Sequence, residues 1–135
     1  MTFFTRKKAN TTVSSKETGR SEHIEQREFV SWFRKNYKGI RIIAIPNGGQ
    51  RNIATAARLK AEGVTPGVPD LYVPVWHLWI EMKKANGGKI SSQQKDWHNY
   101  LHLIKHNVII TAGFEDAQSQ IKDFIETMEE ESYGT

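Results

Sequence analysis

The sequence predicts an α/β domain in which helices cover a mixed β-sheet. Segments with helical periodicity alternate with short runs rich in Ile and Val along the 135-residue chain. The predicted order is helix, strand, helix, strand, strand, helix, strand, helix, and such alternation is typical of α/β architectures. The length suits one domain, and 38% hydrophobic with 25% charged residues is ordinary for a globular protein.

The first half of the domain is expected to contain two helices separated by a strand. Ser21 can cap a helix that ends near 38–39, where a glycine follows a lysine. The β-branched run at 40–45 predicts a short buried strand, and the segment 46–49, with its proline and two glycines, breaks it. A second helix is then expected over 52–62.

The second half is expected to hold a hairpin, a helix, a strand and a final helix. Two strands over about 70–75 and 77–83 are expected to pair around a turn. A helix over about 92–106 starts behind a serine cap, and a buried strand over 108–111 follows it. The amphipathic segment 115–128 predicts the last helix.

Composition divides the chain into three parts. Residues 1–20 are rich in Thr, Ser, Lys and Arg and predict a flexible basic arm, which serves either solubility or non-specific phosphate contact. Residues 21–128 form the folded domain, and 129–135 form an acidic tail that we expect to be frayed. The formal net charge of +4 is a mild basic excess and does not by itself require a polyanionic partner.

Several classes of protein are excluded or disfavoured by composition. The chain has no cysteine, which excludes disulfides and thiolate metal sites. No apolar run approaches the roughly 20 residues of a membrane span, and the N-terminus lacks the apolar segment of a secretory signal. We therefore expect no membrane partner and a cytoplasmic location, which is the host cytoplasm if a phage encodes the chain.

The predicted hairpin carries the chemistry of the chain. Asp70 starts the first of its apolar runs, and Glu81 lies near the end of the second. Because strand side chains alternate between faces, Glu81 and Lys83 point the same way and Met82 points into the core. If the runs pair, Asp70 comes back beside Glu81. Two carboxylates and one ammonium would then converge on a single spot.

A converging pair of carboxylates suits a hard divalent cation. Mg²⁺ prefers oxygen ligands from one or two carboxylates, water and substrate phosphate. Such an ion can acidify a water molecule and stabilise charge on a phosphodiester, and Lys83 could donate to the developing negative charge. The Met82 carbonyl and a carboxylate from Glu25 could add further oxygens. A plain salt bridge across the hairpin explains the same spacing without any catalysis.

Four segments of the sequence resemble a known nuclease family. They are IPNGG at 45–49, GVTPGVPDL at 63–71, IEMK at 80–83 and NGGKISSQQKDW at 86–97. Together they resemble the VRR-NUC domain, the virus-type replication-repair branch of the PD-(D/E)XK nuclease superfamily. The resemblance covers about 22–125, and its specificity lies in the combination of the pieces rather than in any one of them. It implies a restriction-endonuclease-like core.

The resemblance also implies roles for individual residues. The Asp and Glu of the family motif bind a divalent metal and the Lys is catalytic, which implies those roles for Asp70, Glu81 and Lys83. The first-helix acid of the family, usually followed by Gln, corresponds to Glu25. The family glutamine of the helix after the motif best matches Gln94, although Gln93 beside it leaves the register open by one residue.

We therefore predict a Mg²⁺- or Mn²⁺-dependent DNA endonuclease. The resemblance implies a homodimer that acts on branched DNA such as four-way junctions, in phage or bacterial replication and repair. Two alternatives remain: a non-cleaving nucleic-acid-binding module on the same fold, and a sequence-specific restriction-type endonuclease. Basic side chains expected to bind the DNA backbone are Arg51, Arg58, Lys60, Lys84 and Lys89.

Histidines and tryptophans are the other conspicuous residues. His98, His102 and His106 recur every fourth residue and share one helix face, but no third ligand signature accompanies them, so structural or solvated roles are favoured over a metal site. Trp32 and Trp97 fall at helical core positions and are expected to pack in the core rather than to stack on bases.

Overall fold

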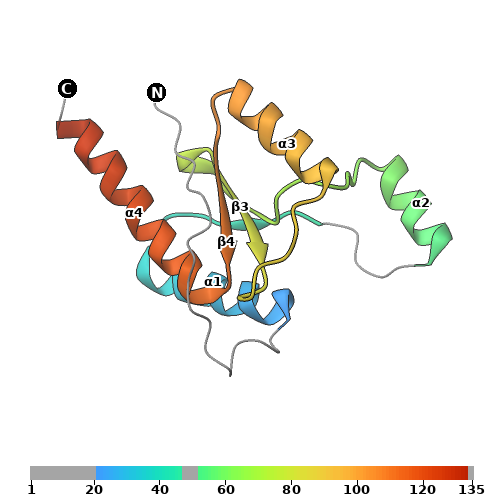
Figure 1. Ribbon diagram of the computed structural model, residues 1–135, viewed down its shortest axis with the longest axis horizontal. Helices are drawn as coiled ribbons and strands as arrows, with labels where there is room; N and C mark the ends of the chain where they lie inside the picture. The colour runs from blue at the N-terminus through green and yellow to red at the C-terminus, as the bar shows by residue number, and fades with distance from the viewer. Residues whose placement is uncertain (1–20, 47–51, 134–135) are drawn as a thin grey trace.

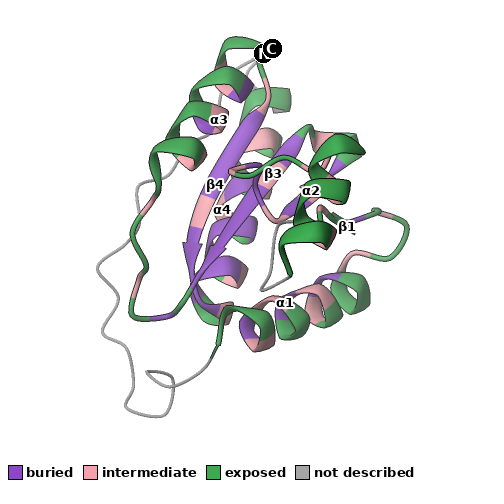
Figure 2. Ribbon diagram, turned by 90° about the vertical axis from the view of Figure 1, so that its right-hand side faces the viewer, coloured by how far each residue is buried: buried purple, intermediate pink, exposed green. Residues whose placement is uncertain are grey.

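The computed structural model describes residues 21–46 and 52–133. The chain is an α/β domain, as predicted, with a mixed sheet whose strands lie in the order β1-β2-β3-β4. The pairs β1–β2 and β2–β3 are antiparallel, and β3–β4 is parallel. Figure 2 shows the buried strands β3 and β4 enclosed by helices.

The elements follow the predicted order. The helices are α1 (Glu22–Asn36), α2 (Ile53–Ala61), α3 (Ser92–Leu103) and α4 (Phe114–Tyr133). The strands are β1 (Ile43–Ala44), β2 (Leu71–Val73), β3 (Leu78–Lys83) and β4 (Asn107–Ala112). A 3-10 turn, η1 (Pro74–Trp76), joins β2 to β3, and His77 after it adopts a left-handed φ of 47°.

Side-chain caps set where the helices begin. Ser21 accepts a hydrogen bond from the Ile24 N–H at 3.3 Å, and Asn52 accepts one from the Thr55 N–H at 2.7 Å. Ser91 and Gln94 form a reciprocal capping box at the start of α3. The predicted Ser21 and Ser91 caps are therefore confirmed.

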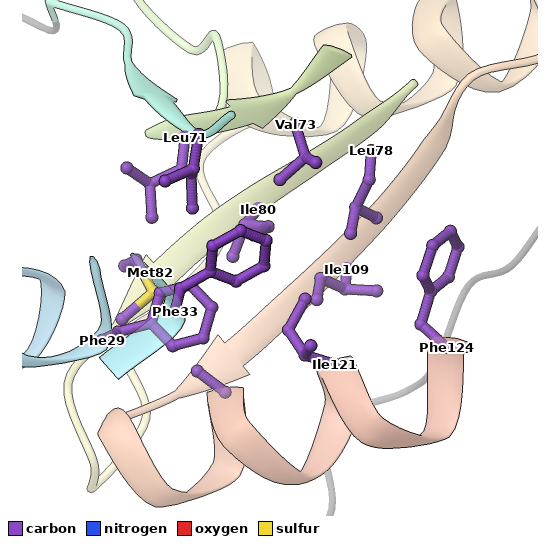
Figure 3. Close-up of a cluster of buried hydrophobic side chains, with 12 residues drawn as sticks. Phe29, Phe33, Leu71, Val73, Leu78, Ile80, Met82, Ile109, Ile121 and Phe124 are labelled. Atoms are coloured by element: carbon purple, nitrogen blue, oxygen red, sulfur yellow. The ribbon is translucent and has the colours of Figure 1, made fainter. Parts of the chain in front are cut away.

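The core lies between the sheet and the pair α1 and α4. The face of β3 that carries Leu78, Ile80 and Met82 packs against aromatic and aliphatic side chains of both helices (Figure 3). The buried contributions from the helices are Phe29, Phe33, Ala117, Ile121 and Phe124. Because side chains alternate, Trp79, Glu81 and Lys83 point to the other face, which α3 covers.

The first strand is shorter and more exposed than predicted. Only 43–44 of the expected 40–45 pairs with β2, and both residues are exposed, with Ile43 at 47%. The strand lies at the edge of the sheet, and beyond the ladder a backbone hydrogen bond of 2.8 Å from the Ile45 N–H to the Asp70 carbonyl continues the contact. Ile42 just before it is the residue of this run that enters the core.

One helix contributes nothing to the core, and another is longer than expected. Helix α2 stands away from the sheet in Figure 1 and contributes no buried residue, and Ile53 at its start is 90% exposed. Helix α4 continues to Tyr133 instead of ending near 128. Within the described residues, no helix has both the length and the apolar character needed to cross a membrane.

The two tryptophans expected in the core are only partly buried. Trp32 packs against the core cluster, with its ring 5.8 Å from Phe29 and 5.6 Å from Tyr37. Trp97 is not part of the cluster and meets the exposed Tyr100 ring edge-on at 5.6 Å. The prediction for Trp97 is wrong because the buried face of α3 is formed by His98 and Leu101.

Candidate active site

The hairpin brings Asp70 beside Glu81. The register pairs Leu71 with Ile80, which leaves Asp70 and Glu81 at the next position of the ladder. The Met82 N–H donates a hydrogen bond of 2.7 Å to Asp70 Oδ2, and the Asp70 and Glu81 side chains are themselves within hydrogen-bonding contact. The structure thus places the two carboxyl groups together, as the sequence predicted.

Glu81 is buried, with 2% of its surface exposed. Burial raises the pKa of Glu81, while the hydrogen bond with Asp70 and the charge of Lys83 lower it and the charge of Glu22 raises it. Its Oε1 atom finds no hydrogen-bond partner among the described residues. A buried carboxylate oxygen beside a second carboxyl group is what a divalent cation would stabilise, so these residues fit the implied metal.

Lys83 is held by the helix that covers it. Its Nζ donates to Gln94 Oε1 at 3.0 Å, and the same oxygen accepts the Ser91 N–H at 2.9 Å. Gln94 therefore caps α3 and orients the lysine at once. Gln93 is exposed, so of the two candidate glutamines Gln94 is the one that contacts Lys83.

A glycine fixes the loop that carries Asp70. Gly67 has a φ of +93°, and a Cβ built on it would lie 2.6 Å from the backbone oxygen of Gln93. The loop before β2 therefore packs directly on the first turn of α3. This contact ties Asp70 to the helix that orients Lys83, and only glycine fits such a close approach.

Glu25 lies against the start of α4, and its part in a metal site stays a prediction. It is 1% exposed, and its Oε2 accepts the Phe114 N–H at the start of α4. A Cβ built on Gly113 would lie 3.4 Å from the same oxygen. Glu25 therefore caps α4 and joins the first helix to the last.

Glu22, one turn earlier on α1, is the first-helix acid whose charge acts on Glu81. A Cβ built on Gly88 would lie 3.7 Å from Glu22 Oε1 and 3.4 Å from Lys83 Cδ, so both side chains border this glycine. Sequence reasoning missed Glu22 because Glu25 matched the resemblance. Their spacing of three residues on one helix was the available signal.

His98 faces Glu81 from α3, one turn after Gln94. It is 7% exposed, and its Nε2 lies 3.6 Å from Glu81 Oε1. Burial lowers the pKa of His98, and the nearby Lys83 charge lowers it further, so the imidazole is neutral near pH 7. The two groups are therefore not an ion pair, and the distance is too long for a hydrogen bond.

Comparison with solved structures identifies the fold. A "VRR_NUC domain protein" superposes with a TM-score of 0.66 and 24% sequence identity, over 80% of this chain and 90% of that chain. The chain has the VRR-NUC fold. No family model matches the sequence, and no curated protein matches it. The expected fold is confirmed by structure even though sequence identity is low.

The basic residues predicted to bind DNA differ in their exposure and in their pairing. Lys60, Lys84 and Lys89 are exposed, while Arg58 is paired with Glu62 at 3.0 Å on the surface of α2. Arg51 lies outside the described residues. These placements leave Lys84 and Lys89 as the predicted bases closest in sequence to the Asp70–Glu81 pair.

A basic groove beside α1 was not anticipated from the sequence. It has a volume of about 640 Å³ and an apolar floor that includes Val30 and Ile43. His23, the neighbour of Glu22 in sequence, is among its lining residues, and none of the described acidic residues lines it. Its cationic lining residues are Arg27, Arg34, Lys35 and Lys38.

The described residues alone do not make a complete cation site. Among residues 21–46 and 52–133, no three His, Asp or Glu side chains are gathered closely enough to hold an ion by themselves. Because Mg²⁺ commonly keeps several waters and takes phosphate oxygens from its substrate, a pair of carboxylates is a sufficient protein contribution.

Proposed function

We propose that the protein is a metal-dependent DNA endonuclease. The observation that supports this proposal is the convergence of Asp70, Glu81 and a glutamine-held Lys83 within a VRR-NUC fold. A purely DNA-binding module needs neither a buried carboxyl group with a second one beside it nor a buried ammonium held nearby, since burying a charged group is costly.

Each residue is given one task in this proposal. Asp70, Glu81 and the Met82 carbonyl would hold Mg²⁺ or Mn²⁺, with Glu22 taking the place first assigned to Glu25. The bound ion supplies an acidified water and neutralises phosphate charge. Lys83 donates to the oxygen on which negative charge develops, and Gln94 keeps its Nζ in position.

The charged surface suggests where DNA would lie. Lys84 and Lys89 are exposed shortly after Lys83 in the sequence, and the lining of the groove beside α1 includes His23, the neighbour of Glu22 in sequence. A duplex whose phosphate contacts the metal ion held by Glu81 could continue along α1 over the groove. Binding through such contacts would release counterions and weaken steeply with salt.

We further propose branched DNA, such as a four-way junction in phage or bacterial replication and repair, as the substrate. This rests on the resemblance to small stand-alone members of the family. Cutting both strands of a junction requires two sites, and a two-fold homodimer would supply them in a symmetric arrangement.

Cleavage of labelled DNA by the purified chain tests the proposal. We expect a four-way junction to be cut with Mg²⁺ or Mn²⁺ and to remain intact with EDTA. Lys83→Ala should abolish cutting while DNA binding persists, and Lys122→Gln, which alters an exposed lysine on α4 that has no assigned role, should still cut. Tight binding without any metal-dependent cutting would instead favour the non-cleaving module. Cutting of linear duplex at one sequence would favour a restriction-type enzyme.

A further inference from the structure

Two buried polar atoms face each other across the space between α3 and β3. They are Nε2 of His98 and Oε1 of Glu81, and they lie 3.6 Å apart. Neither atom has a hydrogen-bond partner among the described residues. Buried polar atoms are nearly always satisfied, so two unsatisfied atoms that face each other indicate a missing shared partner.

The surrounding structure holds both groups in place. Glu81 lies within β3, which is paired with β2 on one side and β4 on the other. His98 lies on α3, whose first turn is fixed by the capping box and by the Gln94–Lys83 hydrogen bond. The facing arrangement therefore follows from the fold and does not depend on a mobile surface side chain.

The distance suits two ligands of one metal ion. With metal–ligand bonds of about 2.1 Å, two donors on a tetrahedral or octahedral ion lie about 3.0–3.4 Å apart, slightly closer than these atoms are. A small inward movement of either side chain would bring both to an ion between them. A water molecule could also occupy such a place, and the experiment below distinguishes the two.

We propose that His98 is a nitrogen ligand of the divalent ion at Glu81 and that it biases the site toward Mn²⁺ over Mg²⁺. This inference rests on the metal-dependent function proposed above. Imidazole nitrogen is a good ligand for transition metals, whereas Mg²⁺ prefers oxygen ligands. Glu81 and His98 provide part of the coordination shell, and water and phosphate oxygens complete it.

Metal binding to the full-length protein tests this assignment without relying on cleavage. Titration calorimetry with Mn²⁺ and with Mg²⁺ would compare wild type, His98→Gln, Glu81→Gln and the matched control His102→Gln, which alters the next turn of the same helix. We expect His98→Gln to weaken Mn²⁺ binding at least tenfold and Mg²⁺ binding less than threefold, by analogy with ligand-shell substitutions. His102→Gln should leave both affinities within twofold.

Electron spin-echo spectroscopy of the Mn²⁺ complex gives a readout that a structural role would not produce. Wild type and His102→Gln should show coupling to a directly bound ¹⁴N nucleus, and His98→Gln should lose it. Absence of nitrogen coupling in wild type overturns the assignment even if His98→Gln fails to fold. If Glu81→Gln nevertheless abolishes Mn²⁺ binding, the metal site stands and only the role of His98 is wrong. If wild type binds neither ion, with or without junction DNA, the proposed function fails as well.

Discussion

Gln94 combines a structural and a positional task in one oxygen atom. Gln94 Oε1 accepts from Lys83 Nζ at 3.0 Å and from the Ser91 N–H at 2.9 Å. The helix cap therefore sets the position of the lysine, and any change that frays the first turn of α3 also moves the ammonium. Stability and chemistry are linked here through a single side chain.

Replacing Gln94 with Ala should affect both properties. We expect the loss of its part in the cap to cost about 1 kcal/mol, which lowers the unfolding temperature by a few degrees. Single-turnover cleavage of junction DNA should slow at least tenfold because Lys83 is no longer oriented. Gln93→Ala, an exposed neighbour, is the control, and equal slowing by both variants would remove Gln94 from the mechanism.

Substitutions of Glu22 and Glu25, the two acids of α1 discussed above, should have different effects on cleavage and on urea unfolding. Glu22→Gln is expected to slow cleavage at limiting metal at least tenfold with an unchanged urea midpoint, because this side chain is exposed. Glu25→Ala is expected to lose about 2 kcal/mol of unfolding free energy, because the Phe114 N–H then loses the buried carboxyl oxygen that accepts its hydrogen bond. Slower cleavage with unchanged stability for Glu25→Ala, together with a lower urea midpoint for Glu22→Gln, would assign the metal-site role to Glu25 instead.

Protonation of Glu81 has a predictable effect on stability. Burial raises its pKa above the ordinary value of 4.5. A carboxyl group whose pKa is higher in the folded state binds its proton more firmly there, so stability falls as pH rises from the unfolded pKa through the folded one. In EDTA, Glu81→Gln should therefore match wild type near about pH 4 and exceed its urea midpoint near about pH 8. If the urea midpoints of Glu81→Gln and wild type differed by the same amount at both pH values, the Glu81 carboxyl would not be the cause of the pH dependence.

At the level of elements, the hairpin and the order of helices and strands could be predicted from the sequence. Both depend on local periodicity, and so does the shared face of Glu81 and Lys83. What could not be predicted depends on packing between elements. The run 40–45 has strong β propensity, yet only two of its residues form ladder pairs with β2, at the edge of the sheet.

The same reason explains which site residues were missed. Glu22 and His98 reach Glu81 from two different helices, and no local pattern records such distances. Periodicity placed His98 on a helix face but did not show what that face covers. For Glu25, the resemblance suggested a part in metal binding, and only the structure shows that it caps α4.

The loop before β2 allows a test at the scale of one element. Gly67→Ala should destabilise the fold and displace Asp70, because its Cβ would overlap the Gln93 backbone. Gly63→Ala is the control: its φ of +104° is also strained, but no atom lies within 4 Å of the added Cβ. We expect urea unfolding to show about 1 kcal/mol of loss for Gly63→Ala and more for Gly67→Ala. Cleavage should fall only in the second variant.

Among the described residues, positive charge lines the groove beside α1 and negative charge gathers at the far end of α4. The groove beside α1 carries Arg27, Arg34, Lys35 and Lys38 without an acidic neighbour in its lining. The exposed acids Glu126, Glu129, Glu130 and Glu131 lie near the end of α4. Such polarity would orient an approaching polyanion before contact.

Removing charge from the groove should weaken DNA binding without stopping chemistry. For Arg34→Ala combined with Lys35→Ala, we expect the salt dependence of junction binding to fall by about 1.8 in slope, since each phosphate contact contributes about 0.9. Lys122→Gln on α4 is the control. Fluorescence anisotropy over a range of salt concentrations measures both, and an unchanged slope would place the DNA elsewhere.

The contact between Glu25 and Phe114 spans 89 residues of chain. During synthesis, α1 leaves the ribosome long before Phe114, whose backbone N–H donates a hydrogen bond to Glu25 in the folded domain. At translation speeds of roughly 5–20 residues per second, about 4–18 s pass between the synthesis of Glu25 and that of Phe114. The emerging chain therefore cannot close its domain until the last helix has begun, and a truncated product would expose its unfinished core to chaperones and proteases.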